Sequence, residues 1–195
     1  MNDLSKQISF ISEVDQLKSI LRQTALLSNE RRENSAEHSW HAALTAQVLF
    51  PYFEIEISTE KVTKMLLIHD IVEIDAGDTF AFNSKYYSEE QAQNEKKAAH
   101  RIFGLLPDEQ STHFESLWLE FEEGKTNEAK CAKAIDRILP AIQNIENFGG
   151  TWKKYNISRD QILARNQILK EIAPKLWVYL NEKLKIAIQN KWIKD

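Results

Sequence analysis

"LLIHDIVEIDAGDTF", residues 66–80, places one histidine and four carboxylates among apolar side chains that are typical of a buried helix. Carboxylates are rarely buried in proteins unless they are paired or bind a metal. On a helix, Glu73 is four residues from His69 and three from Asp70, so all three side chains project from neighbouring positions. We therefore expect His69 and Asp70 to supply a nitrogen and an oxygen ligand to one metal, with Glu73 and Asp78 beside it.

Two further segments could complete this metal site. His38 lies in AEHSWH, near the start of a predicted helix. Asp136 lies on an otherwise apolar helix face, four residues before Pro140, whose ring removes a backbone hydrogen bond and predicts a kink at Asp136. Mixed nitrogen and oxygen ligands suit one divalent ion of Mn, Co, Zn, Ni or Fe, and the sequence does not choose among these metals. The predicted metal ligands are His38, His69, Asp70 and Asp136.

Most other segments show the apolar spacing of helices rather than the alternation of strands. We predict an all-α single domain over residues 1–195, with a core at about 20–150 and C-terminal helices at 158–192 packing on it. The segment EIEIS at 54–58 alternates like a strand, but it is too short and isolated to support a sheet. The expected bundle has about eight helical segments, at 9–27, 36–50, 59–75, 88–103, 107–122, 126–148 and 158–192 (interrupted by Pro174), with a loop at 79–87.

Composition excludes several classes of function. The net charge of −4 gives no basic surface of the kind that nucleic-acid-binding proteins need. The single cysteine, Cys131, excludes an intramolecular disulfide and fits a reducing compartment. The N-terminal residues lack the pattern of a signal peptide, and no stretch approaches the ~20 apolar residues of a membrane span. We therefore expect a cytoplasmic protein that binds neither nucleic acid nor membranes.

The order of the predicted ligands, His38, then His69-Asp70, then Asp136, resembles the pattern of HD-domain metal-dependent phosphohydrolases. RRENSAEHS at 31–39 and HDIVEIDAGD at 69–78 resemble the branch that contains bacterial 5'-deoxynucleotidases and their uncharacterised relatives. The resemblance covers most of the chain, certainly about 20–140. It implies an HD-domain helical bundle that removes the 5'-phosphate from nucleoside monophosphates with one bound divalent metal, and a homodimer.

The resemblance also implies roles for individual residues. Glu73 would act on the attacking water, Asp78 would contact the sugar, and Arg22, placed near the end of the first predicted helix, would bind the phosphate. Arg31 and Arg32 compete with Arg22 for that role, and Arg165 has no assigned role. In the deoxynucleotidases a tryptophan that helps to reject ribose follows the phosphate-binding arginine. Gln23 occupies that position here, so the resemblance does not decide between ribose and deoxyribose.

Two alternative functions remain open at this point. One is hydrolysis of a guanosine pyrophosphate alarmone, although the first histidine of those enzymes lies in a Gly-Pro-Tyr-rich context that RRENSAEHS does not resemble. The other is a non-catalytic helical binding module that keeps a metal for stability. His41 is expected to serve packing, and His100 and His113 are weaker candidates for a second metal site. The apolar residues Leu176, Trp177, Leu180 and Leu184 could form either a dimer interface or part of the core.

Overall fold

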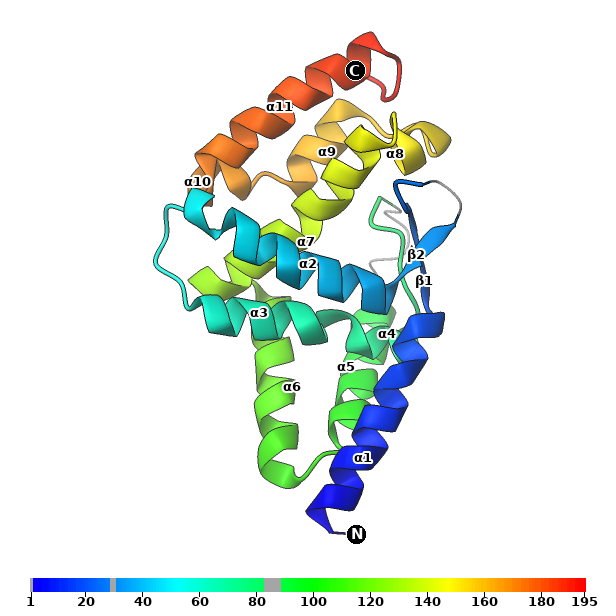
Figure 1. Cartoon of the computed structure of the whole chain (residues 1–195), viewed down its shortest axis with the longest axis vertical. Coiled ribbons are helices and arrows are strands. Elements are labelled where there is room, and N and C mark those ends of the chain that lie inside the picture. The colour runs from blue at the N-terminus through cyan, green and yellow to red at the C-terminus, as the bar shows by residue number, and fades with distance from the viewer. Residues whose placement is uncertain (1, 29–30, 83–88) are drawn as a thin grey trace.

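Helices form most of the computed structural model, which describes residues 2–28, 31–82 and 89–195. In Figure 1, α2, α3 and α7 cross in the middle of the molecule, α1, α5 and α6 extend to the N-terminal end, and α8–α11 lie around the opposite end of α7. The α-helices are α1 (Asp3–Val14), α2 (Ser35–Leu49), α3 (Thr59–Ile68), α4 (Glu73–Ala76), α5 (Glu89–Phe103), α6 (Asp108–Glu123), α7 (Asn127–Glu146), α8 (Gly150–Lys154), α9 (Arg159–Arg165), α10 (Leu169–Ile172) and α11 (Pro174–Gln189).

The predicted all-α class is confirmed, with several helices starting at side-chain caps. Asn34 accepts a hydrogen bond from the backbone of Glu37, and the Glu37 carboxylate accepts one from the backbone of Asn34, which forms a capping box at the start of α2. Pro140 lies inside α7 as predicted. None of the helices in the described part of the chain is long and apolar enough to cross a membrane.

The first predicted helix, at 9–27, is wrong in its second half. Helix α1 ends at Val14, a 3-10 turn follows, and β1 (Leu21–Ala25) pairs antiparallel with β2 (Arg32–Asn34). Leu21 lies opposite Asn34 in this hairpin. The apolar spacing continues past Val14, but pairing with a segment further along the chain overrides it. Arg22 therefore projects from a strand and not from the end of a helix.

The predicted helix at 59–75 is also divided. Helix α3 ends at Ile68, His69–Val72 form a 3-10 turn, and α4 begins at Glu73. Because a 3-10 turn has three residues per turn, it aligns Asp70 with Glu73 more closely than an α-helix would. Gly77 ends α4 with a positive φ of 75°, a backbone conformation that favours glycine, and Asp78 follows it.

At the C-terminal end, α8 was not predicted, and the helical region at 158–192 is divided into α9, α10 and α11. The bundle therefore has more and shorter helices than the predicted eight. Leu176, Leu180 and Leu184 of α11 are buried, so this stripe belongs to the core. Of the loop predicted at 79–87, residues 83–87 lie outside the described residues.

Candidate metal and phosphate site

Three elements that are distant in the sequence bring two histidines and one aspartate together. The ligand atoms of His38 on α2, His69 in the 3-10 turn and Asp136 on α7 lie within 4.8 Å of one another. Asp136 Oδ1 is 3.0 Å from His38 Nε2 and 3.5 Å from His69 Nε2. Asp70 Oδ1 is 3.1 Å from the same His69 nitrogen. His69 therefore lies next to each of the other three predicted metal ligands.

The environment of His69 fits a metal ligand. Its Nδ1 lies 2.8 Å from the carbonyl oxygen of Leu66, to which only a protonated nitrogen can donate. In the neutral ring this bond leaves Nε2 as the bare nitrogen that could bind a metal, and Nε2 is buried without a hydrogen-bond partner among the described residues. Together with two carboxylates and a second imidazole, this nitrogen forms a donor set for a divalent transition metal.

The charges around the two histidines favour a proton on the His69 ring, which a metal would have to displace. Burial lowers the pKa of His69, but the neighbouring Asp70 and Asp136 outweigh it and raise the pKa to about 9. Burial acts to raise the pKa of Asp136, but its contacts with His38 and His69 hold it well below its usual range. Without a metal, a proton on the His69 ring therefore compensates the buried carboxylates.

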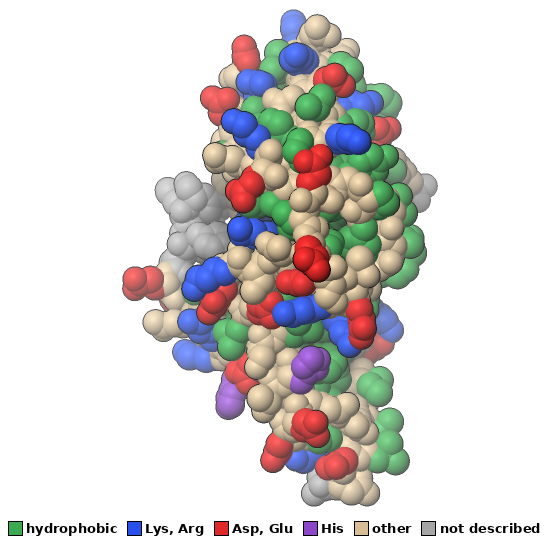
Figure 2. All heavy atoms as spheres, turned by 90° about the vertical axis from the view of Figure 1, so that its left-hand side faces the viewer, with side chains coloured by type: hydrophobic (Ala, Val, Ile, Leu, Met, Phe, Trp, Pro, Cys, Tyr) green, Lys and Arg blue, Asp and Glu red, His purple; other side chains and the backbone are tan. Residues whose placement is uncertain are grey.

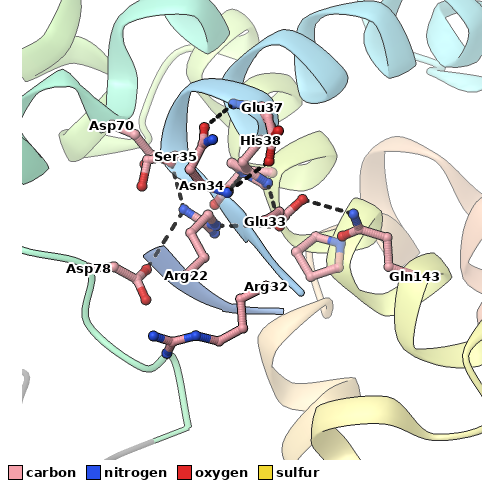
Figure 3. A network of polar contacts seen from close by, with 12 residues as sticks. Arg22, Arg32, Glu33, Asn34, Ser35, Glu37, His38, Asp70, Asp78 and Gln143 are labelled. Carbon is pink, nitrogen blue, oxygen red and sulfur yellow. Dashed lines mark hydrogen bonds and ion pairs between the residues drawn. The ribbon is translucent and has the colours of Figure 1, made fainter. Parts of the chain in front are cut away.

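Arg22 lies at the centre of the acidic groups beside this cluster. Its Nη1 is 2.6 Å from Asp70 Oδ2, 3.7 Å from Glu73 Oε1 and 3.8 Å from Asp78 Oδ1. Burial would lower the pKa of the guanidinium, but these carboxylates raise it above its ordinary value. Figure 3 shows Arg22 reaching from β1 toward Asp70 and Asp78. Asp70 therefore turns one oxygen toward the histidines and the other toward a fixed cation.

Glu73 and Asp78 lie on the same side of the site as Arg22. Burial and the charge of Asp70 raise the pKa of Glu73 well above its usual range, against the opposing effect of Arg22. The hydroxyl of Ser35 donates a hydrogen bond to Glu73 Oε2. Burial also raises the pKa of Asp78. A buried carboxyl group whose pKa is raised toward neutrality can exchange a proton during a reaction.

Two residues of this site were missed in the sequence. Glu33 is only 1% exposed, and its carboxylate lies between Arg22, His38 and Gln143. Burial acts to raise the pKa of Glu33, but His38, Gln143 and Arg22 outweigh it and lower the pKa below its ordinary value. Ser35 is the second. Both precede His38 in the segment ENSAEH. A carboxylate just before a helix that carries a predicted metal ligand was the signal that could have pointed to Glu33.

A pocket lies over the site, and its lining includes His69, Arg22 and Glu73. Beyond the residues already described, it is lined by an aromatic group and a polar group. The aromatic group includes Phe80, Phe82 and Trp152, and the polar group includes Lys133, Arg137, Arg165 and Asn166. The side chain of Gln23, also on the pocket wall, accepts a hydrogen bond from the Tyr155 hydroxyl at 2.9 Å.

Other polar residues that the sequence brought into question lie elsewhere. Arg31 pairs with the partly exposed Glu37, with Nη2 2.6 Å from Oε1. The side chain of His100 is 84% exposed and faces Glu115. Neither His100 nor His113 belongs to a cluster of metal-ligating groups among the described residues. These side chains therefore provide no second metal site in the described part of the chain.

Comparison with known proteins agrees with this geometry. The model of the HD domain family matches residues 14–177, which is most of the chain. The chain belongs to the HD domain family. The matched region contains every residue of the HD-domain site described above, from Arg22 to Asp136.

Two relatives connect this HD domain to named proteins. The 5'-deoxynucleotidase HDDC2 of Dictyostelium discoideum is 31% identical over 150 residues, which cover 73% of this chain and 78% of that protein. The 5'-deoxynucleotidase HDDC2 of Danio rerio is 28% identical over 172 residues, which cover 85% of this chain and 84% of that protein.

A solved structure matches the HD domain over nearly its whole length. It is the "Predicted metal-dependent phosphohydrolase" of Magnetospirillum magnetotacticum MS-1, which is 41% identical, covers 99% of both chains and has a TM-score of 0.90. An HD-domain phosphohydrolase from Listeria innocua shares the fold, with a TM-score of 0.66 at 19% identity.

Proposed function

We propose that this protein is a metal-dependent phosphomonoesterase that removes the 5'-phosphate from nucleoside monophosphates. The observation that carries the proposal is the buried Nε2 of His69, which makes no hydrogen bond to the described residues and faces a second histidine and two carboxylates. The largely buried guanidinium of Arg22 lies directly beside this group. A cluster that only stabilised the fold would not need an arginine and two largely buried acids next to it. The relatives named 5'-deoxynucleotidase support the choice of substrate.

In this proposal His38, His69, Asp70 and Asp136 hold one divalent metal. Such a metal lowers the pKa of a bound water and polarises a phosphoryl group. The carbonyl of Leu66 holds the His69 ring in the orientation that ligation requires. The set of nitrogen and oxygen donors leaves the choice among Mn, Fe, Co, Ni and Zn to experiment.

Arg22, Glu73 and Asp78 would handle the substrate. Arg22 supplies a permanent, buried positive charge with several N–H donors, which suits recognition of a phosphate dianion. Glu73, fixed by Ser35 and carrying a raised pKa, would exchange the proton of the attacking water. Asp78, placed just beyond Gly77, would accept a hydrogen bond from a sugar hydroxyl.

Gln23 bears on the choice of sugar. Its side chain is held by the Tyr155 hydroxyl, and the Tyr155 ring in turn packs on Phe80 with ring centroids 4.5 Å apart. A polar amide at this position does not present the bulk of an indole to a 2'-hydroxyl. We therefore expect ribonucleotides and deoxyribonucleotides to be hydrolysed at comparable rates.

A homodimer is the proposed assembly, and α2 offers a surface for it. Trp40, Leu44 and Val48 recur at every fourth residue of α2 and are 62%, 47% and 65% exposed. In Figure 2, hydrophobic side chains gather along the right-hand edge of the molecule, which is the side that faces the viewer in Figure 1. Acidic and basic side chains are scattered over the rest of the face shown in Figure 2. Such a stripe is typical of a helix covered by a partner. Light scattering of the wild type and of Trp40→Asp would test the dimer. We expect a dimeric wild type and a monomeric variant, and a monomeric wild type would contradict the proposal.

The function is tested by phosphate release from a panel of substrates. Metal-stripped protein would be reloaded with Mn, Co, Zn, Ni or Fe and assayed with ribo- and deoxyribonucleoside monophosphates, a guanosine pyrophosphate alarmone and a phosphodiester. We expect hydrolysis of several monophosphates and none of the diester. Preferential hydrolysis of the alarmone would replace the proposal with the pyrophosphohydrolase. No hydrolysis, combined with a metal-dependent melting temperature, would favour the binding module.

A further inference from the structure

Glu33 is a buried carboxylate with three partners on three different elements. One oxygen, Oε2, accepts a hydrogen bond from Gln143 Nε2 of α7 at 2.9 Å. The other, Oε1, lies 3.5 Å from His38 Nδ1 on α2 and 3.6 Å from Arg22 Nε on β1. Figure 3 shows the carboxylate between these groups. An ionised group in such a place is costly to bury unless its neighbours compensate it.

The contact with His38 bears on metal binding. His38 is fully buried and points Nε2 at Asp136, so Nε2 is the nitrogen available to a metal. For Nε2 to bind, the ring proton must be on Nδ1, and Nδ1 has no hydrogen-bond partner among the described residues. Glu33 Oε1 is the acceptor that this proton faces. The two histidines are thus oriented differently, His69 by a neutral carbonyl and His38 by a carboxylate, which also makes the imidazole a stronger ligand.

The contact with Arg22 bears on phosphate binding. The guanidinium faces a carboxylate at both ends, with Nε toward Glu33 and Nη1 toward Asp70. If Asp70 gave Oδ1 to a metal, its negative charge would be shared with that ion, and its attraction for the guanidinium would weaken. Glu33 takes no part in that ligation, so its hold on Nε remains. Arg22 would then keep its orientation while its Nη atoms become available to a phosphate oxygen.

We propose that Glu33 is a positioning residue that couples the metal site to phosphate recognition, because the same carboxylate oxygen orients His38 and Arg22. The proposal rests on the proposed function of the site. It differs from a purely structural role, in which Glu33 would only tie the β1–β2 hairpin to α7 through Gln143. The structural role predicts lower thermal stability alone, whereas the positioning role predicts weaker binding of two different ligands.

The test compares Glu33→Gln with Glu37→Gln in the full-length protein. Glu37 lies in the same motif, but it pairs with Arg31, and glutamine also serves in its capping box, so it is a matched control. Affinity for Zn or Co is measured by competition with a chelator, and affinity of the metal-loaded protein for inorganic phosphate by calorimetry. We expect Glu33→Gln to weaken metal binding about 10- to 100-fold, as for other residues that orient ligands, and to weaken phosphate binding at least about 5-fold. Glu37→Gln should change both by less than about twofold.

Metal and phosphate affinities of Glu33→Gln that match those of Glu37→Gln would overturn the proposal, whatever the melting temperatures. If Glu33→Gln does not fold, Gln143→Met is the second variant, because it keeps the Glu33 charge and removes the donor that holds it. We expect it to weaken metal binding by about threefold, less than loss of the charge itself, and an unchanged affinity would again contradict the coupling. Neither readout needs turnover. Absence of phosphatase activity would therefore refute the proposed function and leave this result intact.

Discussion

The helical half and the hairpin half of the site differ in what they contribute. The helical half, His38, His69, Asp70 and Asp136, comes from α2, the 3-10 turn and α7 and forms the candidate metal cluster. The hairpin half, Arg22 and Glu33, lies on β1 and β2 and supplies a cation and a carboxylate that face the cluster. The first half offers ligand atoms that converge on one point. The second half offers the guanidinium of Arg22, which has no lone pair for a metal but has N–H donors that suit a phosphate.

From this difference we predict that metal binding and phosphate binding can be lost separately. A change confined to the hairpin should alter substrate affinity and leave the metal in place. A change in the helical half should remove the metal and, with it, all turnover. Glu33 is the exception that the structure singles out, because it contacts both halves.

The largest expected effect is that of Asp136→Ala. Loss of this carboxylate removes a proposed metal ligand and leaves the two histidines without their shared partner. We expect metal content to fall to background and phosphatase activity to fall at least ~10³-fold, since the chemistry depends on the metal. Metal analysis and phosphate release measure the two effects. Asp75→Ala is the control, because Asp75 pairs with Arg101 away from the cluster. Full activity of Asp136→Ala would show that Asp136 is not a metal ligand.

The next effect is that of Glu73→Gln, which keeps the size of the side chain and a partner for Ser35 but removes the exchangeable proton. We expect kcat to fall about 10²- to 10³-fold with metal affinity changed by less than about threefold. Steady-state kinetics and a metal titration on the same preparation separate the two quantities. An unchanged kcat would remove Glu73 from the reaction.

A smaller effect is expected for Arg22→Lys in the hairpin half. Lysine keeps the charge but loses the planar set of donors, so KM for a nucleoside monophosphate should rise about 10- to 100-fold while metal content stays at one per chain. Arg31→Ala, also next to the hairpin but paired with the partly exposed Glu37, should leave KM unchanged. If Arg31→Ala raised KM and Arg22→Lys left it unchanged, Arg31 would replace Arg22 as the phosphate-binding arginine.

The last prediction concerns pH, and its effect is about tenfold for each pH unit. Because His69 has a pKa of about 9 without metal, the metal must displace a proton at neutral pH. Metal affinity should therefore rise about tenfold per pH unit up to about 9 and then level off. The same raised pKa stabilises the metal-free fold below about pH 6.5, and this stabilisation should be lost between about 6.5 and 9. Chelator competition and urea unfolding across this range check both, and a metal affinity that is flat from pH 7 to 9 would contradict the first.

The sequence predicted the helical half better than the hairpin half, for a physical reason. His69 and Asp70 are adjacent, the apolar face and Pro140 pointed to Asp136, and the AEHSWH segment with the family resemblance pointed to His38. Even there the predicted secondary structure was wrong, since a 3-10 turn replaces the predicted helix at His69. Residue types and spacing along one segment are local properties, and a sequence shows them directly.

The hairpin half depends on contacts that the sequence does not show. Residues 21–25 continue the apolar spacing of the preceding helix, and only pairing with 32–34 makes them a strand. The importance of Glu33 comes from Gln143, which is 110 residues away in the chain, and from the side of β2 on which its carboxylate lies. No pattern within the motif distinguishes the buried Glu33 from Glu37, which pairs with Arg31 at the surface.

The most direct test of the account is a titration of activity with metal. Stripped protein would receive increasing amounts of Mn or Co, and phosphate release from a nucleoside 5'-monophosphate would be measured at each step. The account predicts no release without metal, a linear rise, and a plateau at one metal per chain, with no activity at any step for Asp70→Ala. Release that is independent of metal, or wild-type activity in Asp70→Ala, would contradict it.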